Sequence, residues 1–253
     1  MVYALKKINI GESYELKENL EEYKLTYKLI NINPKLKIVK KYGIEIKKLD
    51  KYNLVMYILM EPANCDWEQE LINRRKDSAY YTEDQIMSIL KSLVQTFSEL
   101  QKMGISHRDV KPQNILCYGE EGYKLSDFGE AKTKTDDIEI INNTQRQTIR
   151  GTELYMSPIL FKALRLNIKE QVEYNAFKSD VFSLGMCFLL ASSLNYQSLF
   201  EIREIYDMDI IAKVVEKYLG NIYSKNFINL ILMMLNVDEK LRPDFIELNS
   251  LLN

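Results

Sequence analysis

The pattern of hydrophobic and polar residues changes about a quarter of the way along the chain. Stretches typical of β-strands cover residues 2–8, 37–42 and 53–60, and the last of these is strongly apolar. Residues 14–30 have a helical pattern in which apolar side chains share one face with Glu22. This order predicts a small strand-rich lobe that contains one helix.

Helical patterns dominate after Pro62. Thr82 is followed by acidic residues and is therefore the predicted N-cap of a long amphipathic helix. This helix is expected over residues 85–103 and ends at Gly104. The run over residues 181–194 is apolar all round, as expected of a helix that is buried in protein. We therefore predict an α+β protein in which the strand-rich lobe is joined to a larger helical lobe.

Composition narrows the class of protein. The chain has 253 residues, 46% hydrophobic and 28% charged, so it can bury a substantial core and is not expected to be disordered. A formal charge of −2 gives no reason to expect a nucleic-acid or membrane-surface partner. The N-terminus lacks the apolar core of a signal peptide, and the run over 181–194 is shorter than the ~18 residues of a membrane span.

Cysteine usage indicates the compartment. Cys65, Cys117 and Cys187 are scattered, without the spacing of a metal site or a disulfide framework. We therefore expect reduced thiols in a cytoplasmic protein, with the nucleus as an alternative location.

The candidate chemistry lies on a polar loop directly after the long predicted helix. Asp109 and Asn114 stand five residues apart on this loop, with Lys111 between them, and Asp127 follows thirteen residues later in an Asp-Phe-Gly sequence. Mg²⁺ prefers hard oxygen ligands and retains substrate oxygens, so this set suits Mg²⁺-bound phosphates better than a metal cage made of protein alone. Phosphoryl transfer asks the protein mainly for positioning and charge neutralisation.

These residues resemble the catalytic loop and the metal-binding turn of the protein kinase family, with Val110 in the position of a leucine. The resemblance implies that Asp109 accepts the proton of the substrate hydroxyl. It also implies that Asn114 and Asp127 hold Mg²⁺ ions, the latter the ion that bridges the β- and γ-phosphates of ATP. Lys111 is the form found in serine/threonine kinases and would neutralise charge on the phosphoryl group in transfer.

Further motifs extend the resemblance toward the C-terminus. Residues 151–158 resemble the end of an activation segment, in which Thr152 would form hydrogen bonds near Asp109 and Lys111. Asp180 begins a stretch that resembles the central helix of the large lobe, where it would brace the backbone of the catalytic loop.

The N-terminal motifs supply the nucleotide-binding residues. The sequence Tyr-Ala-Leu-Lys that ends at Lys6 resembles the strand whose lysine contacts the α- and β-phosphates. Glu22 is the expected helix glutamate that orients Lys6 through an ion pair, and Glu21 is the weaker alternative.

The expected adenine site lies at the end of the last predicted strand. Met60 would line the back of the pocket, and the backbone of Glu61 and Ala63 would bond the adenine, over a floor formed by Leu116.

Two features depart from the family pattern. The chain starts at the strand that bears Lys6 and holds no Gly-x-Gly-x-x-Gly loop, so we expect a small lobe without its first two strands, either in a fragment or in a natural short form. Ile159 stands where the family has a glutamate that pairs with the arginine equivalent to Arg242. We expect Arg242 to find another partner or to be exposed, and the activation segment to be looser.

Thr148 is the candidate for regulation. It precedes Thr152 by four residues, and Arg108 is an arginine of the kind that pairs with an activation-loop phosphate. The resemblance implies an activating kinase that modifies Thr148, and the competing interpretation is a solvated threonine that is never modified.

Together these features predict one protein kinase domain over residues 1–253, with a truncated small lobe over 1–61 and a large helical lobe over 62–253. The expected fold is the bilobal kinase fold, with an antiparallel sheet in the small lobe. The expected activity is ATP- and Mg²⁺-dependent transfer to serine or threonine hydroxyls of a protein substrate. The alternative is a pseudokinase that acts as a scaffold; a small-molecule kinase fits less well because of Lys111 and the later motifs.

Overall fold

The computed structural model describes residues 2–50, 53–133, 144–147, 149–168 and 172–253. The chain divides into two compact units, each assembled from two separate stretches. Met1–Trp67 and Asn114–Gly129 form the first, named here the sheet unit, and Glu68–Gln113 with Glu130–Asn253 form the second, the helical unit. The prediction of a mixed α+β protein with an N-terminal antiparallel sheet followed by a mostly helical region is confirmed.

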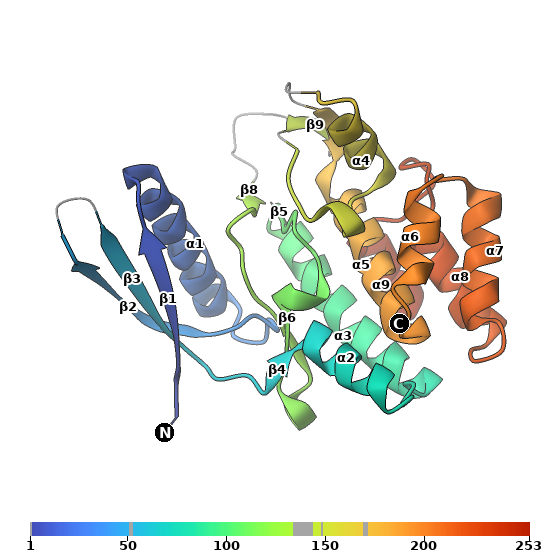
Figure 1. Ribbon diagram of the computed structural model, residues 1–253, viewed down its shortest axis with the longest axis horizontal. Helices are drawn as coiled ribbons and strands as arrows, with labels where there is room; N and C mark the ends of the chain where they lie inside the picture. The colour runs from blue at the N-terminus through green and yellow to red at the C-terminus, as the bar shows by residue number, and fades with distance from the viewer. Residues whose placement is uncertain (1, 51–52, 134–143, 148, 169–171) are drawn as a thin grey trace. The chain divides into compact units, whose positions relative to one another are not determined.

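A three-stranded antiparallel sheet and one long helix make up the first part of the sheet unit (Figure 1). In spatial order the strands are β1 (Ala4–Ile10), β3 (Leu54–Met60) and β2 (Lys41–Lys48), and α1 (Ser13–Ile32) lies along one face of them. Ile10, Met56 and Ile58 are buried on this face, and side chains of α1 pack against them. Burial of the helix face is what holds α1 to the sheet.

The helix predicted over residues 14–30 is confirmed as α1. Its start is defined by Glu15, whose Oε2 accepts the backbone N–H groups of Gly11 (2.8 Å) and Glu12 (3.2 Å). The helix ends before Pro34, which disfavours helical backbone in the residue that precedes it.

The strand predicted over residues 37–42 is wrong in position, because β2 starts only at Lys41. Ile38 instead forms an isolated parallel bridge with Leu125, and Ile38 and Val39 are both buried. These apolar residues pack against the second stretch of the sheet unit, and so they are not part of the antiparallel sheet.

That second stretch contributes a small sheet of its own. Its strands, in spatial order, are β4 (Cys65–Asp66), β6 (Ile115–Cys117) and β7 (Tyr123–Leu125). The hairpin between β6 and β7 turns through the 3-10 turn η2 (Gly119–Glu121) and Gly122, which has a φ of 84°. Asn114 and Asp127 stand at the open end of this hairpin.

The helical unit is built on helices that bury apolar side chains. The helices are α2 (Trp67–Lys76), α3 (Glu83–Lys102), α4 (Pro158–Arg165), α5 (Ala176–Ser193), α6 (Gln197–Arg203), α7 (Met208–Leu219), α8 (Lys225–Met234) and α9 (Phe245–Leu252). Short strands between the helices form two pairs, β5 (Ile105–Ser106) with β8 (Lys132–Thr133) and β9 (Thr144–Gln147) with β10 (Val172–Asn175). The chain also contains the 3-10 turns η1 (Pro112–Asn114) and η3 (Glu153–Tyr155).

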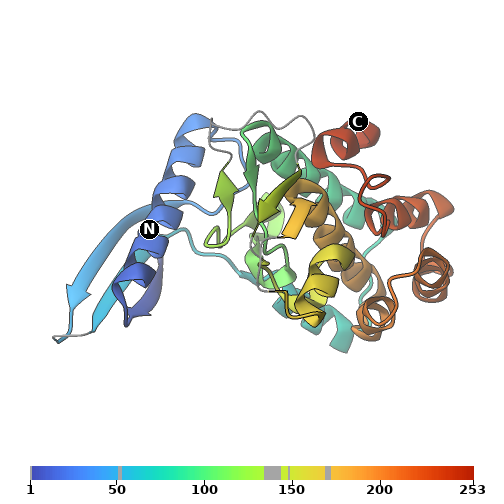
Figure 2. The same cartoon turned by 90° about the horizontal axis from the view of Figure 1, so that it is seen from above.

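Helix α3 begins at the predicted cap. Thr82 Oγ1 accepts the backbone N–H of Gln85 (3.3 Å), while Gln85 Oε1 accepts the backbone N–H of Thr82 (2.9 Å). Near its other end, the Phe97 ring stacks on the Phe245 ring of α9 with centroids 4.5 Å apart, and Figure 2 shows the two helices side by side.

Helix α5 is buried on all sides. Every one of its residues except Lys178 is buried, as the apolar run over 181–194 predicts. No helix in the described ranges has the length and hydropathy of a membrane span.

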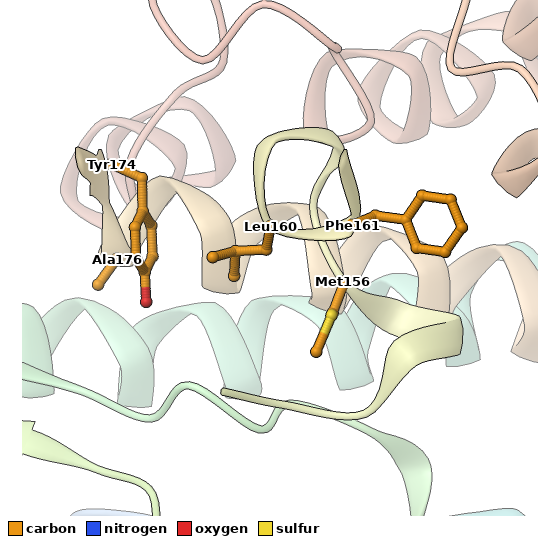
Figure 3. Close-up of a cluster of buried hydrophobic side chains, with 5 residues drawn as sticks. All are labelled: Met156, Leu160, Phe161, Tyr174 and Ala176. Atoms are coloured by element: carbon orange, nitrogen blue, oxygen red, sulfur yellow. The ribbon is translucent and has the colours of Figure 1, made fainter. Parts of the chain in front are cut away.

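An apolar cluster packs α4 against β10 in the helical unit. Its five buried members are Met156, Leu160, Phe161, Tyr174 and Ala176. Figure 3 shows Leu160 and Phe161 pointing to opposite sides of the segment, and the Phe161 ring meets the Tyr206 ring edge-on at 5.4 Å. The cluster fixes the chain directly after the segment that carries Thr152.

Arg242 finds its partners among backbone carbonyls. It is 1% exposed, so the expected alternative of solvent exposure is wrong. Its guanidinium donates to the carbonyl oxygens of Asn236 (2.8 Å), Lys178 (3.0 Å) and Val237 (3.5 Å). Burial lowers the pKa of Arg242 to about 10, while nearby acidic groups act in the opposite direction.

We predict that Arg242→Lys lowers the free energy of unfolding by about 1–3 kcal/mol, because an ammonium group cannot serve three separate carbonyls and some are left unpaired. Urea unfolding measures this difference. Arg75→Lys, at an exposed position of α2, is the matched control and should change stability by less than about 0.5 kcal/mol. Equal losses for both variants would contradict the role of the carbonyl contacts.

Candidate active site

Asp109, Lys111 and Thr152 form a closed triangle of polar contacts in the helical unit. Lys111 Nζ lies 2.7 Å from Asp109 Oδ2 and donates to Thr152 Oγ1 at 2.8 Å. Thr152 Oγ1 in turn donates to Asp109 Oδ1 at 2.8 Å. Both oxygens of the carboxylate are therefore held by groups that stabilise its charged form.

The environment keeps Asp109 ionised. Burial acts to raise the pKa of Asp109, but the hydrogen bonds from Lys111 and Thr152 outweigh it and hold the pKa below its usual value. The side chain is still 14% exposed. An ionised and accessible carboxylate of this kind can accept a hydrogen bond from a hydroxyl group.

A carboxylate of α5 fixes the backbone of the loop that carries Asp109. Asp180 Oδ2 accepts the backbone N–H of His107 (2.7 Å), and its Oδ1 accepts that of Arg108 (2.9 Å). Burial raises the pKa of Asp180 to about 7, and the two hydrogen bonds act in the opposite direction. Arg108 adopts a φ of 68°, an uncommon value for a residue other than glycine, so the two bonds hold the loop in a strained turn.

His107 is part of the packing of this loop. It is 1% exposed, its Nδ1 accepts the backbone N–H of Asp109 at 3.4 Å, and its ring meets that of Phe97 edge-on at 6.2 Å. These contacts favour a structural role for the histidine.

The metal-binding candidates lie at the open end of the β6–β7 hairpin, in the sheet unit. The backbone oxygen of Asn114 accepts both the N–H (2.9 Å) and the hydroxyl (3.1 Å) of Ser126, which brings Asn114 close to the residue before Asp127. Asp127 has a φ of 56°, its side chain is exposed, and it forms no hydrogen bond or ion pair with another described residue.

This hairpin end fits a Mg²⁺ ion that also binds phosphate oxygens. An exposed carboxylate with no hydrogen-bond or ion-pair partner among the described residues suits the sparse protein ligand set that Mg²⁺ uses with nucleotides. The described residues contain no group of three acidic, histidine or cysteine side chains suited to hold a metal. The remaining ligands would therefore have to come from the phosphates and water.

The residues expected around adenine also belong to the sheet unit. Asn64 donates its backbone N–H to Cys117 O (2.9 Å), and this bond ties the segment after Met60 to the strand that contains Leu116. The side chains of Met60, Ala63 and Leu116 are all partly exposed, so apolar surface remains for a ligand.

The side chain of Glu61 is fully engaged within the protein. It is 8% exposed, and its two oxygens accept the backbone N–H of Lys40 (2.7 Å) and Lys124 Nζ (2.8 Å). Its own backbone N–H donates to Lys40 O at 3.0 Å. These contacts fix the course of the chain at the expected adenine site without using the groups of Ala63.

The structure corrects the expected partner of Glu22. Lys41, at the start of β2, forms a buried ion pair with Glu22 Oε1. Lys6 is half-buried on β1, and its ammonium group forms no ion pair or hydrogen bond with any other residue that the structure describes. The physical reason is burial. Lys41 is enclosed between α1 and the sheet, so its ammonium group needs a counter-charge more than the half-buried ammonium group of Lys6 does.

Comparison with known proteins identifies the family. A family model described as Protein kinase domain matches residues 1–251. The chain belongs to the protein kinase family. It is 29% identical, over 99% of its length, to a probable serine/threonine-protein kinase of Dictyostelium discoideum, and 30% identical, over 91%, to the probable serine/threonine-protein kinase nek2 of the same organism.

A third relative is the serine/threonine-protein kinase cds1 of Schizosaccharomyces pombe, 32% identical over 61% of the chain. The chain spans 22%, 53% and 32% of the length of these three proteins, so each of them contains further sequence outside the matched part.

Sequence patterns identified the motif residues of this kinase domain but missed two lysines. Lys41 and Lys124 lie outside any motif, and each pairs with a buried glutamate, Glu22 and Glu61 respectively. The sequence around Lys41 and Lys124 gives no local signal of this pairing. The regulatory candidate Thr148 lies outside the described residues.

Gly151 brings the segment of Thr152 against the catalytic loop. Its φ is 109°, and a Cβ atom at this position would lie 2.8 Å from the backbone oxygen of Arg108. We predict that Gly151→Ala combines backbone strain with displacement of the loop that carries Asp109, at a combined cost of about 2–5 kcal/mol.

Gly122→Ala is the matched control, because Gly122 has a φ of 84° but no atom within 4 Å of a Cβ. It should cost only the strain, about 1–2 kcal/mol. Chemical denaturation of the two variants measures the difference. Equal losses of unfolding free energy in the two variants would mean that the close approach of Gly151 to Arg108 does not affect stability.

Proposed function

We propose that this kinase domain transfers the γ-phosphate of ATP to serine or threonine hydroxyls of proteins. The observation that carries the proposal is the closed triangle of Asp109, Lys111 and Thr152 on a loop braced by Asp180. A scaffold would have no need to keep a catalytic carboxylate ionised, accessible and held by two donors.

In this proposal each member of the triangle has one role. Asp109 accepts the hydrogen bond of the substrate hydroxyl and takes its proton as the oxygen attacks the γ-phosphorus. The bond from that phosphorus to the β–γ bridging oxygen breaks, and ADP leaves. The Lys111 ammonium, which already contacts the carboxylate, neutralises charge on the phosphoryl group during transfer. Thr152 holds the other two in place and so acts as a positioning residue.

The sheet unit supplies the proposed nucleotide contacts. Asp127 and Asn114 would hold Mg²⁺, which, when bound, draws charge from the phosphate oxygens. Lys6 would contact the α- and β-phosphates.

Adenine would lie on Leu116 and against Met60, bonded by the backbone of Glu61 and Ala63. The partly exposed side chains of Met60 and Leu116 support this placement.

Two further parts of the proposal concern partners. The named relatives are serine/threonine-protein kinases, and the Lys111–Thr152 bond agrees with a protein substrate of that type. An activating kinase that modifies Thr148 remains part of the proposal on the strength of the sequence pattern around Arg108.

A pseudokinase is the second candidate, and one observation favours it. Glu22 pairs with Lys41 instead of Lys6, so the glutamate that the family uses to orient the phosphate-binding lysine is engaged elsewhere. This candidate predicts a folded protein without Mg²⁺-dependent nucleotide binding.

Thermal stability with ATP tests the two candidates. A nucleotide that binds only the folded state stabilises it by about 2.7 kcal/mol at a hundredfold excess over Kd, so we expect a rise in Tm with ATP and Mg²⁺ and none with ATP in EDTA. Asp127→Ala should abolish the rise at a small cost in stability, about 1 kcal/mol, because the side chain is exposed but its backbone is left-handed. A folded protein whose Tm does not respond to millimolar ATP would support the pseudokinase, and a positive shift should be followed by a phosphotransfer assay.

The pKa of Asp109 gives a second prediction. Thr152→Val removes one of the hydrogen bonds that lower this pKa while it keeps the shape of the side chain, so the pKa should rise. Because Asp109 must be ionised to act as a base, the acid limb of the profile of kcat/KM against pH should move to higher pH. Ser250→Ala, at an exposed position of α9, should leave the limb unchanged. A limb that stays in place in Thr152→Val would exclude Asp109 as the titrating base.

A further inference from the structure

A buried ion pair joins α1 to β2 in the sheet unit. The side chains of Lys41 and Glu22 are only 5% and 4% exposed, and the ammonium group contacts Glu22 Oε1. Both charges have lost most of their water, so either one left alone would be strongly destabilising. Glu22 therefore needs a cationic partner in every folded molecule.

The strand register puts a second lysine on the same side of the sheet. Lys41 stands opposite Met60 of the central strand, and Lys6 stands opposite Ile58, two residues along that strand. Residues two apart on a strand point to the same face, and Ile58 is buried on the face that α1 covers. Lys6 and Lys41 thus approach α1 from the two edge strands that flank β3.

The two lysines differ in what holds them. Lys41 is buried and paired, whereas Lys6 is half-buried and has no ionic or hydrogen-bond partner among the described residues. The pair in the structure uses Oε1 of Glu22, and a lysine side chain is long enough to reorient by rotation about its four side-chain bonds. The carboxylate of Glu22 is thus a charge for which both lysines can compete.

We propose that Lys41 is a positioning residue that competes with Lys6 for Glu22. In the state that the structure shows, Lys41 holds the carboxylate, and Lys6 lacks the ion pair that would orient it. When Glu22 moves to Lys6, the lysine proposed to contact the nucleotide phosphates is fixed in place. The consequence for nucleotide binding depends on the proposed kinase function, whereas the competition itself does not.

A double-mutant cycle on thermal stability tests the competition without any activity. Lys6→Met alone should change Tm by less than about 2 °C, because Glu22 keeps Lys41. Lys41→Met alone should lower Tm moderately, because Lys6 takes over the carboxylate. The double variant leaves Glu22 buried without a cation, so its Tm should fall by about 6 °C or more beyond the sum of the single effects.

Lys7→Met is the matched control. Lys7 is exposed, next to Lys6, and stands opposite Tyr57, so it points to the other face of the sheet. When Lys7→Met is combined with Lys41→Met, the two changes in Tm should add. Additive effects for Lys6 as well would overturn the proposal, because they would mean that Lys6 does not reach Glu22.

A second variant covers the case in which Lys41→Met does not fold. Glu22→Met with Lys41→Met replaces both charges by apolar groups and should give a folded protein. If that pair folds and Lys41→Met alone does not, Lys6 cannot replace Lys41 and the proposal is wrong.

Nucleotide affinity gives the functional readout. With ATP and Mg²⁺ as the probe, Lys41→Met should bind several-fold more tightly than the unmodified protein, and Glu22→Gln added to it should abolish the gain. If Lys41 has a merely structural role, Lys41→Met should bind ATP more weakly or with unchanged affinity. Either result would overturn the proposal that Lys41 keeps Glu22 from Lys6. If none of the variants binds ATP while the stability cycle is non-additive, the proposed kinase function fails but the competition for Glu22 stands.

Discussion

The catalytic loop of this kinase domain depends on one buried carboxylate. Asp180 lies on the most deeply buried helix and receives the backbone N–H groups of His107 and Arg108. These bonds offset part of the desolvation that raises its pKa, and they hold Arg108 in a left-handed conformation that is uncommon for residues other than glycine. The direction in which Asp109 leaves this turn, and with it the triangle to Lys111 and Thr152, follows from that anchor.

Buried charges recur elsewhere in the chain, and each is compensated differently. Glu22 has Lys41, Glu61 has Lys124 together with a backbone N–H, and Arg242 has three carbonyl oxygens. Such contacts contribute little net stability, but the loss of one partner is costly, so they favour one arrangement of the chain over others. They fix α1 on its sheet, the segment after β3, and the C-terminal end of the helical unit.

Much of the fold could be predicted from the sequence. The helix of Glu22, the cap at Thr82 and the buried helix after Asp180 all follow from local periodicity and capping chemistry, which depend on near neighbours in the chain. The prediction failed for residues 37–42, where Ile38 has the alternation of a strand residue but is buried against Leu125, a contact between residues far apart in the sequence.

The sequence by itself determined the family, because loop motifs such as that of Asp109 and Asn114 have fixed spacings. Only the tertiary structure decided which charges are paired. Lys6 was the partner expected for Glu22 from the sequence, but the fold buries Lys41, at the start of β2, against Glu22 under α1. Arg242 likewise had no visible partner until the chain brought three carbonyls around it. Ion pairs and buried hydrogen bonds depend on distance and desolvation, and neither is encoded by local pattern.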